Sequence, residues 1–193
     1  PKGDRFDAIL HFAAFILVEE SVREPSRYFQ NNTEGSRTLF QYAADTGVSR
    51  VIFSSTAATY GEPRHDLIPE TADQKPVNPY GESKLRSEKL LKEIAKQGQG
   101  PMKFVGLRYF NPAGAHHSLE IGQARPEATH LVNVAAEAAM GKRSKVMIFG
   151  TDYETPDGTC LRDYIHIEDL VDAHILALDY LEGGGESDFF NVG

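Results

Sequence analysis

Tyr80 and Lys84 are the residues of this sequence whose types and spacing most directly suggest chemistry. They stand four positions apart within residues 79–84 (PYGESK), at the start of a segment rich in helix-forming residues. A spacing of four places two side chains on one helix face, one turn apart. An ammonium group beside a phenol lowers the phenol pKa, which would make Tyr80 a usable general acid and base. The plainer alternative is that Tyr80 caps the helix and Lys84 is a solvated surface residue, because so short a motif often occurs by chance.

Hydroxyl side chains end the apolar segment that precedes this motif. Ser54, Ser55 and Thr56 follow the β-branched run at residues 50–53, directly before the loop that leads to Tyr80. A hydroxyl there could share a hydrogen bond with the phenol and a substrate, and complete a path for a proton. The alternative is that these hydroxyls only cap a loop.

Two further polar residues could contact a ligand. Asn31 lies in an otherwise apolar context and either faces a ligand or caps a helix. Arg162 offers a guanidinium group suited to phosphate, although an Arg beside an Asp (Asp163) commonly forms an ion pair instead.

The elements that must position these residues alternate along the chain. The patterns predict strands over 7–14, 50–55, 103–110, 146–150 and 188–192, and helices over 18–29, 32–45, 80–96, 129–140 and 167–181. Such alternation is typical of an α/β fold in which helices cover both faces of a parallel sheet. Ligands of such folds bind at the carboxyl ends of the strands. Residues 11–14, 54–56 and 109–111 should therefore lie near one another.

Composition narrows the classes of partner and the location. The chain has 193 residues and a net charge of −8, which argues against binding nucleic acid or an anionic membrane. No apolar run is long enough to span a membrane, and no metal-binding site is predicted. Cys160 is the single cysteine, so an internal disulfide is impossible and a reducing, cytoplasmic location is expected. Both ends of the sequence suggest a fragment, because each begins or stops beside a predicted strand.

Several motifs run in the same order as in a known family. They are residues 11–14 (HFAA), 20–22 (ESV), 31–32 (NN), 53–57 (FSSTA), 60–61 (YG), 79–84 (PYGESK), 108–116 (RYFNPAGAH), 129–131 (THL) and 150–166. Together they cover nearly the whole chain. The sequence thereby resembles the extended short-chain dehydrogenase/reductase family, in its NAD-dependent epimerase/dehydratase branch.

The resemblance implies a fold and a domain division. The expected fold is a Rossmann-like doubly wound parallel sheet that lacks its N-terminal βα units, with part of a small C-terminal substrate domain. Residues 1–115 would form a partial NAD-binding domain, residues 116–165 part of the UDP-sugar domain, and residues 166–193 a return to the first domain.

The resemblance also implies an activity for the full-length parent, which is epimerisation of a UDP-hexose at C4 through a 4-keto sugar, with NAD as cofactor. UDP-glucose and UDP-galactose would be interconverted. Tyr80 would take the proton of the 4-hydroxyl, Thr56 would hydrogen-bond the same oxygen, and Lys84 would lower the Tyr80 pKa and hold the nicotinamide ribose. The implied cofactor-binding residues are Phe12, Ala13, Ala14, Asn31, Ser54, Tyr80, Lys84 and Tyr109. The implied UDP-sugar residues are Asn111, His130, Leu131 and Arg162, with Arg162 at the diphosphate.

The sequence departs from the family pattern at several points. The glycine-rich turn that would hold the pyrophosphate should precede Pro1, so we expect the 193-residue chain alone to be inactive and free of NAD. Ile16, Glu19 and the pair Val132-Asn133 replace residues more usual in the family.

Other functions remain open. They are another sugar-nucleotide epimerase, a 4,6-dehydratase of the same superfamily, or an inactive fragment without a catalytic role. The dehydratase is disfavoured, because Thr56 is followed by Ala57 and Ala58 rather than by the carboxyl pair that elimination needs. The full-length parent is expected to form a homodimer through its helices near 22–45 and 80–96.

Overall fold

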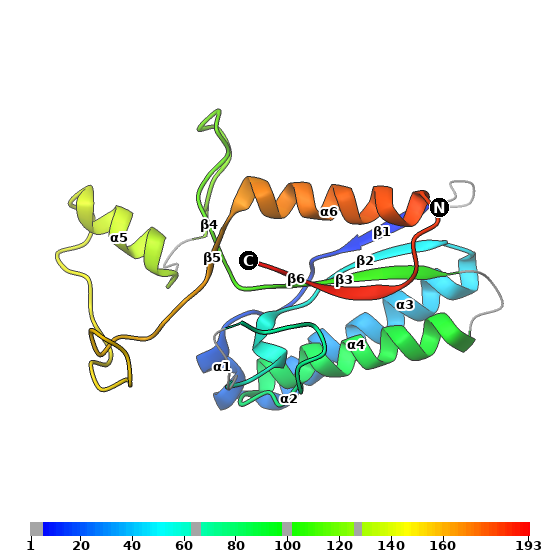
Figure 1. Ribbon diagram of the computed structural model, residues 1–193, viewed down its shortest axis with the longest axis horizontal. Helices are drawn as coiled ribbons and strands as arrows, with labels where there is room; N and C mark the ends of the chain where they lie inside the picture. Colours follow the sequence, from blue (N-terminus) through cyan, green and yellow to red (C-terminus); the bar gives the residue numbers. More distant parts are fainter. Residues whose placement is uncertain (1–5, 63–66, 98–101, 126–128) are drawn as a thin grey trace. The chain divides into compact units, whose positions relative to one another are not determined.

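The computed structural model describes residues 6–62, 67–97, 102–125 and 129–193, which fall into two units. Unit 1 comprises Pro1–Tyr109 and Ala173–Val192, and unit 2 comprises Phe110–Asp172 together with Gly193. Figure 1 shows the elements of both units.

Unit 1 is built on a four-stranded parallel sheet. Its strands are β1 (Ala8–His11), β2 (Arg50–Ser54), β3 (Lys103–Tyr109) and β6 (Asp188–Val192), in the order β1-β2-β3-β6. All three pairings are parallel, as the sequence predicted. The register aligns the carboxyl ends of β1, β2 and β3, with His11 opposite Phe53 and Phe53 opposite Gly106.

Helices cover both faces of this sheet, so the doubly wound arrangement is confirmed. Figure 1 shows α3 (Gly35–Thr46) and α4 (Pro79–Gln97) on one face and α6 (Ile167–Glu182) on the other. The helices predicted over 18–29 and 32–45 are one broken helical stretch. It consists of α1 (Val18–Arg23), α2 (Pro25–Tyr28), the π-helix η1 (Phe29–Glu34) and then α3. The predicted loop after β2 contains the short 3₁₀ helix η2 (Ala57–Thr59).

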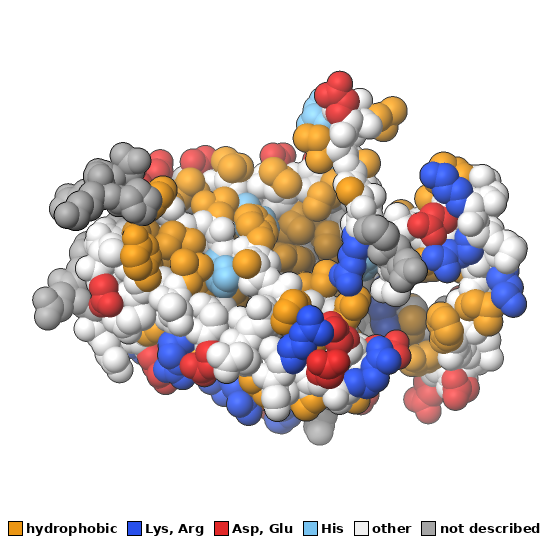
Figure 2. Space-filling view, turned by 180° about the vertical axis from the view of Figure 1, so that it is seen from behind, with side chains coloured by type: hydrophobic (Ala, Val, Ile, Leu, Met, Phe, Trp, Pro, Cys, Tyr) orange, Lys and Arg blue, Asp and Glu red, His pale blue; other side chains and the backbone are white. Residues whose placement is uncertain are grey.

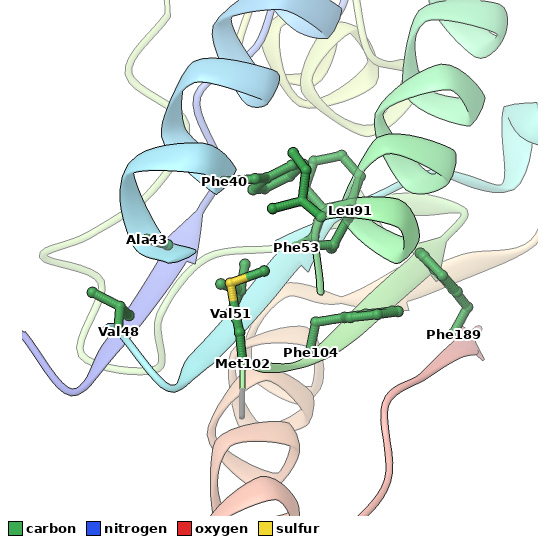
Figure 3. Close-up of a cluster of buried hydrophobic side chains, with 10 residues drawn as sticks. Phe40, Ala43, Val48, Val51, Phe53, Leu91, Met102, Phe104 and Phe189 are labelled. Carbon is green, nitrogen blue, oxygen red and sulfur yellow. The ribbon is translucent and has the colours of Figure 1, made fainter. Parts of the chain in front are cut away.

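Alternate residues of β2 bury their side chains against opposite helical layers, as the period of a strand requires. Val51 and Phe53 join the cluster under α3 and α4, where Figure 3 shows them with Phe40 and Leu91. Ile52 points to the other face and packs with residues of α6. Strand β2 is therefore packed on both faces, and this packing also fixes where the polar residues 54–56 at its carboxyl end lie.

Unit 2 has short elements. A two-stranded parallel sheet pairs β4 (Asn111–Ala113) with β5 (Tyr164–His166), and α5 spans Leu131–Ala139. The sequence patterns missed β4 and β5, because three residues are too few to show a period. The strand predicted over 146–150 is wrong. Its hydrophobic side chains are exposed, Phe149 at 95%, and among the described residues its backbone pairs with no other strand.

Within the described ranges, no helix is both long enough and apolar enough to cross a membrane.

Candidate functional site

Thr56, Tyr80 and Lys84 come together in unit 1, where β2 ends and α4 begins. Thr56 lies two residues beyond the end of β2 and caps η2, with its Oγ1 accepting the N–H of Ala58 at 3.2 Å. Tyr80 lies in the first turn of α4, and its phenol is hydrogen-bonded to the Thr56 side chain. A Cβ added at Gly81 would lie 2.5 Å from the carbonyl oxygen of Ala58. The glycine of the motif thus lets α4 start in close contact with η2, which brings Tyr80 to Thr56.

Lys84 lies one turn further along α4 and is almost fully buried, with 3% of its surface exposed. Its Nζ donates a hydrogen bond to the carbonyl oxygen of Ser54 at 2.7 Å and lies 4.9 Å from the ring centroid of Phe53. Burial lowers the pKa of Lys84 to about 8, against the opposing attraction of Glu88. The alternative that Lys84 is a solvated surface residue is therefore wrong.

The pKa of Tyr80 shifts in the direction opposite to that expected from the sequence. Burial raises the Tyr80 pKa to about 12; the hydrogen bond from Thr56 opposes this rise, and nearby Tyr109 adds to it. The four-residue spacing predicts that the two residues share a helix face, but it does not predict the direction of the lysine side chain. Because the Lys84 ammonium is directed at the Ser54 carbonyl oxygen, it does not offset the cost of burying a phenolate.

Asn32 connects the segments around Tyr80 and Lys84, although the sequence pattern pointed to its neighbour Asn31. The Asn32 Nδ2 donates to Ser83 Oγ at 3.1 Å and to the carbonyl oxygen of Phe15 at 3.0 Å, while its Oδ1 accepts the N–H of Phe15 at 2.8 Å. Asn32 is 1% exposed. Its amide thus joins the segment after β1, the π-helix and α4, and the Asn-Asn pair in an apolar context was the available signal.

A pocket of about 340 Å³ opens in unit 1 beyond the end of β1. It is lined by His11, Ala13, Ala14, Phe15, Asn31 and Gly35. Three of these, Ala13, Ala14 and Asn31, were predicted to line a cofactor. His11, Phe15 and Gly35 were not predicted, although the strand-end motif at 11–14 includes His11.

The remaining predicted cofactor residues of unit 1 lie at the carboxyl ends of the strands. The hydroxyls of Ser54 and Tyr109 hydrogen-bond to each other, which joins the ends of β2 and β3. Phe12 is about half exposed, and its ring centroid lies 4.7 Å from that of His174. Figure 2 shows histidine side chains among hydrophobic ones on the side of the molecule seen from behind.

His11 is a neutral, structural histidine. Its ring stacks on Phe53, and its Nε2 lies 2.9 Å from Ser36 Oγ. Burial, followed by the nearby Lys84 ammonium, lowers the pKa of His11 to about 4. His11 is therefore uncharged at neutral pH and stabilises the pocket wall by packing.

The predicted UDP-sugar residues all belong to unit 2. Asn111 begins β4, and its Nδ2 donates to the carbonyl oxygen of Asp163 at 2.6 Å. Arg162 is exposed, and its Nη1 donates to the carbonyl oxygen of Leu161 at 2.7 Å. His130 is the N-cap of α5 and Leu131 its first residue, and both are exposed.

Comparisons with known proteins agree with these features. The family described as "NAD dependent epimerase/dehydratase family" matches residues 2–193. A UDP-glucose 4-epimerase of Azospirillum brasilense is 52% identical over 192 residues, which are 100% of this chain and 55% of that protein. The chain spans about half the length of the curated relatives it matches.

Solved structures are similar as well. The crystal structure of UDP-glucose 4-epimerase from Brucella ovis in complex with NAD has a TM-score of 0.92 at 43% identity, covering 97% of this chain and 57% of that one. The UDP-Glc/GlcNAc 4-epimerase of Campylobacter jejuni has a TM-score of 0.80 at 52% identity, covering 97% and 56%.

Proposed function

Because the chain belongs to the NAD dependent epimerase/dehydratase family, we propose that the full-length protein containing it epimerises a UDP-hexose at C4. UDP-glucose and UDP-galactose are the proposed pair of substrates, and NAD is the proposed cofactor. The observation that carries the proposal is the joining of Thr56 and Tyr80 by a hydrogen bond, with Lys84 buried one turn away.

The residues of unit 1 fit NAD. The pocket after β1 is walled by alanines and Gly35, whose small size lets a flat ligand approach the backbone. When bound, NAD supplies the acceptor and donor of hydride at the sugar C4. The residues proposed to hold it are Phe12, Ala13, Ala14, Asn31, Ser54, Tyr80, Lys84 and Tyr109.

Tyr80, Thr56 and Lys84 would handle the proton. In the proposed role, the Tyr80 oxygen as phenolate takes the proton of the sugar 4-hydroxyl and returns it to the same oxygen after C4 is reduced from its other face. The Thr56 hydroxyl, which is hydrogen-bonded to Tyr80 in the free protein, would hydrogen-bond that substrate oxygen. Because Tyr80 has a raised pKa, this role requires a positive charge near its phenol, which Lys84 would supply if its ammonium turned from the Ser54 carbonyl oxygen toward the phenol.

Unit 2 would bind the nucleotide sugar. The exposed guanidinium of Arg162 suits the diphosphate, since a planar cation can donate two parallel hydrogen bonds to it. Asn111, His130 and Leu131 would hold the rest of the UDP-sugar. Unit 1 is thus proposed as part of the NAD-binding domain and unit 2 as part of the substrate domain.

The direct test is Tyr80→Phe in the full-length protein, assayed for interconversion of UDP-glucose and UDP-galactose. We expect kcat to fall by about 10²–10⁴-fold, the usual contribution of general acid–base catalysis. Tyr180→Phe is the matched control, since Tyr180 is 43% exposed on α6 and lies outside the proposed dimer contact. Near-normal turnover in Tyr80→Phe would remove Tyr80 from the proton-transfer role.

An N-acetylated UDP-hexose is the second candidate substrate. The 52% identity to the Campylobacter jejuni enzyme, whose description names both glucose and N-acetylglucosamine, favours it. Comparing kcat/KM for UDP-glucose and UDP-N-acetylglucosamine in the full-length protein decides between a strict and a dual specificity.

A homodimer in the cytoplasm completes the proposal. The helical layer from residue 22 to 45 and along 80–96 is the proposed dimer contact. Light scattering on the full-length protein tests it, because a monomer at the working concentration would contradict it.

A further inference from the structure

Three side chains outside the proposed catalytic site gather in unit 2. They are His116 and His117, which follow β4, and Glu168, which lies in the first turn of α6. Each offers one ligand atom, and these atoms all lie within 4.8 Å of one another. The sequence patterns predicted no metal site, because Glu168 is 51 residues away from His117.

The two short strands of unit 2 bring these residues together. β4 and β5 are parallel, and Ala113 lies opposite His166. The chain therefore leaves both strands at the same edge, with His116 and His117 a few residues beyond one strand and Glu168 just beyond the other. Gly114 has φ +101, and a Cβ there would lie 2.4 Å from the His166 ring, so a glycine is needed where the two segments pass each other.

Glu168 is the centre of the cluster. One of its oxygens, Oε1, accepts the N–H of His117 at 3.1 Å and lies 2.6 Å from His117 Nδ1 and 3.8 Å from His116 Nε2. Hydrogen bonds from the His117 side chain and backbone hold the pKa of Glu168 below its usual value, so the carboxylate is ionised at neutral pH. The N–H of Glu168 donates to His166 Nδ1 at 3.3 Å, which helps to fix its position.

The simplest alternative is a surface ion pair between His117 and Glu168. That alternative gives His116 no hydrogen bond to the carboxylate, because its Nε2 lies 3.8 Å from Glu168 Oε1, which is within ion-pair distance but too long for a hydrogen bond. The two imidazole rings lie with their centroids 4.1 Å apart beside one carboxylate. This arrangement brings one nitrogen of each ring and one carboxylate oxygen close enough together to face a single cation.

The distances suit a shared ion. Two ligands on one tetrahedral Zn²⁺, each bonded at about 2.0–2.1 Å, lie roughly 3.3 Å apart. His116 Nε2 is already near that separation from Glu168 Oε1. The His117 Nδ1 would move outward by less than about 1 Å as the ion replaces its proton, and its side chain is 77% exposed and free to do so.

A partner for the other nitrogen of His116 is also present. Ser118 Oγ lies 2.8 Å from His116 Nδ1. An ion bound to Nε2 would select the tautomer in which Nδ1–H donates to this hydroxyl. The protonated Nδ1 could then no longer accept the hydrogen bond from the Ser118 N–H, which measures 3.2 Å.

We propose that His116, His117 and Glu168 form a binding site for a borderline divalent transition-metal ion, of which Zn²⁺ is the typical case. Two imidazoles and one carboxylate are a ligand set that suits Zn²⁺, whereas Mg²⁺ and Ca²⁺ prefer oxygen ligands. The exposure of His117 leaves a coordination position open to water. The ion would tie the segment after β4 to the start of α6.

The test is a calorimetric titration of the purified chain, prepared without a polyhistidine tag, with ZnCl₂. We expect one Zn²⁺ per chain, and no binding of Mg²⁺ under the same conditions. His117→Gln and Glu168→Gln should each weaken Zn²⁺ binding by at least about 10–100-fold, the loss seen even when groups that only orient a ligand are removed. His130→Gln is the matched control, since His130 is an exposed histidine of the same unit, and it should leave the Zn²⁺ affinity unchanged.

Unchanged affinity in both His117→Gln and Glu168→Gln would overturn the proposal, as would an equal loss in His130→Gln. Far-UV circular dichroism checks that each variant keeps its fold. A second measurement needs no variant, because Zn²⁺ should shift the ring proton resonances of His116 and His117 and not those of His11. Equal shifts of all histidine resonances, or none, would also contradict the site.

Discussion

The two units differ in whether they bury charged groups, although both carry exposed ion pairs as well. In unit 1, Lys84, Glu88 and Arg108 are each no more than 3% exposed. In unit 2, the pair of Arg143 and Glu137 keeps 41% and 28% of its side-chain surface exposed, and α5 has no buried residue. The proposed catalytic residues are thus held by the packed interior of unit 1. The proposed UDP-sugar residues of unit 2 lie nearer the surface, where local hydrogen bonds hold Asn111 and Arg162.

The difference is clearest at Glu88, which lies one turn after Lys84 on α4. Its carboxylate accepts hydrogen bonds from Arg108 Nε at 2.9 Å and Nη2 at 2.7 Å, from Gln74 Nε2 at 3.0 Å, and from the Ser55 hydroxyl. One buried carboxylate therefore joins α4, β3, the long loop and the end of β2. A buried charge so fully paired fixes geometry, because any displacement would leave a charge without its partners.

Breaking this pair should give the largest change. Glu88→Ala leaves the Arg108 guanidinium buried without its carboxylate, and we expect a loss of about 3–5 kcal/mol in the free energy of unfolding. Arg143→Ala breaks the exposed pair of unit 2 and should leave that free energy unchanged within error. Urea unfolding followed by circular dichroism measures both. Equal effects of the two variants would contradict the contrast between the units.

The buried histidine of unit 1 should also affect how the free energy of unfolding depends on pH. His11 has a pKa near 4 in the folded chain and an ordinary value of 6.5. Between these values the unfolded state binds more protons, so stability is full above pH 6.5 and falls as the pH falls toward 4, by up to about 3 kcal/mol.

His11→Gln tests this dependence. The variant should flatten the fall of unfolding free energy between pH 6.5 and 4, while His130→Gln, at an exposed position of unit 2, should retain the wild-type slope. Urea unfolding at a series of pH values gives the slopes. A His11→Gln slope equal to that of the wild type would place the acid sensitivity elsewhere.

Much of unit 1 could be predicted from the sequence, because the apolar residues of its strands and helices are spaced as those elements require. The run at 50–54 is buried on both faces, and the helix at 79–97 has its apolar positions at helical spacing. The residues of the proposed proton path also follow from position, since Thr56 lies just beyond a strand and Tyr80 lies in the first turn of a helix. The sign of the Tyr80 pKa shift could not be predicted, because it depends on where the Lys84 ammonium points.

Unit 2 was harder to predict for physical reasons. The apolar run at 146–150 has the composition of a buried strand, yet its side chains are exposed. Composition records the tendency to be buried but not whether a neighbouring strand is present. The cluster of His116, His117 and Glu168 was missed because β4 and β5 are too short to be recognised, and only their pairing brings the three residues together.

Two glycine substitutions should cause smaller losses of stability. One measures the cost of a close contact, and the other measures the cost of backbone strain. Gly81→Ala places a Cβ 2.5 Å from the Ala58 carbonyl oxygen, and the displacement should cost about 1–3 kcal/mol. Gly141→Ala in unit 2 meets nothing within 4 Å but adopts φ +72, so only the strain of a left-handed alanine remains, about 1 kcal/mol. Thermal unfolding of both variants gives the two costs. A cost for Gly81→Ala no greater than that for Gly141→Ala would mean that α4 and η2 can separate freely, and the contact that brings Tyr80 to Thr56 would then be loose rather than fixed.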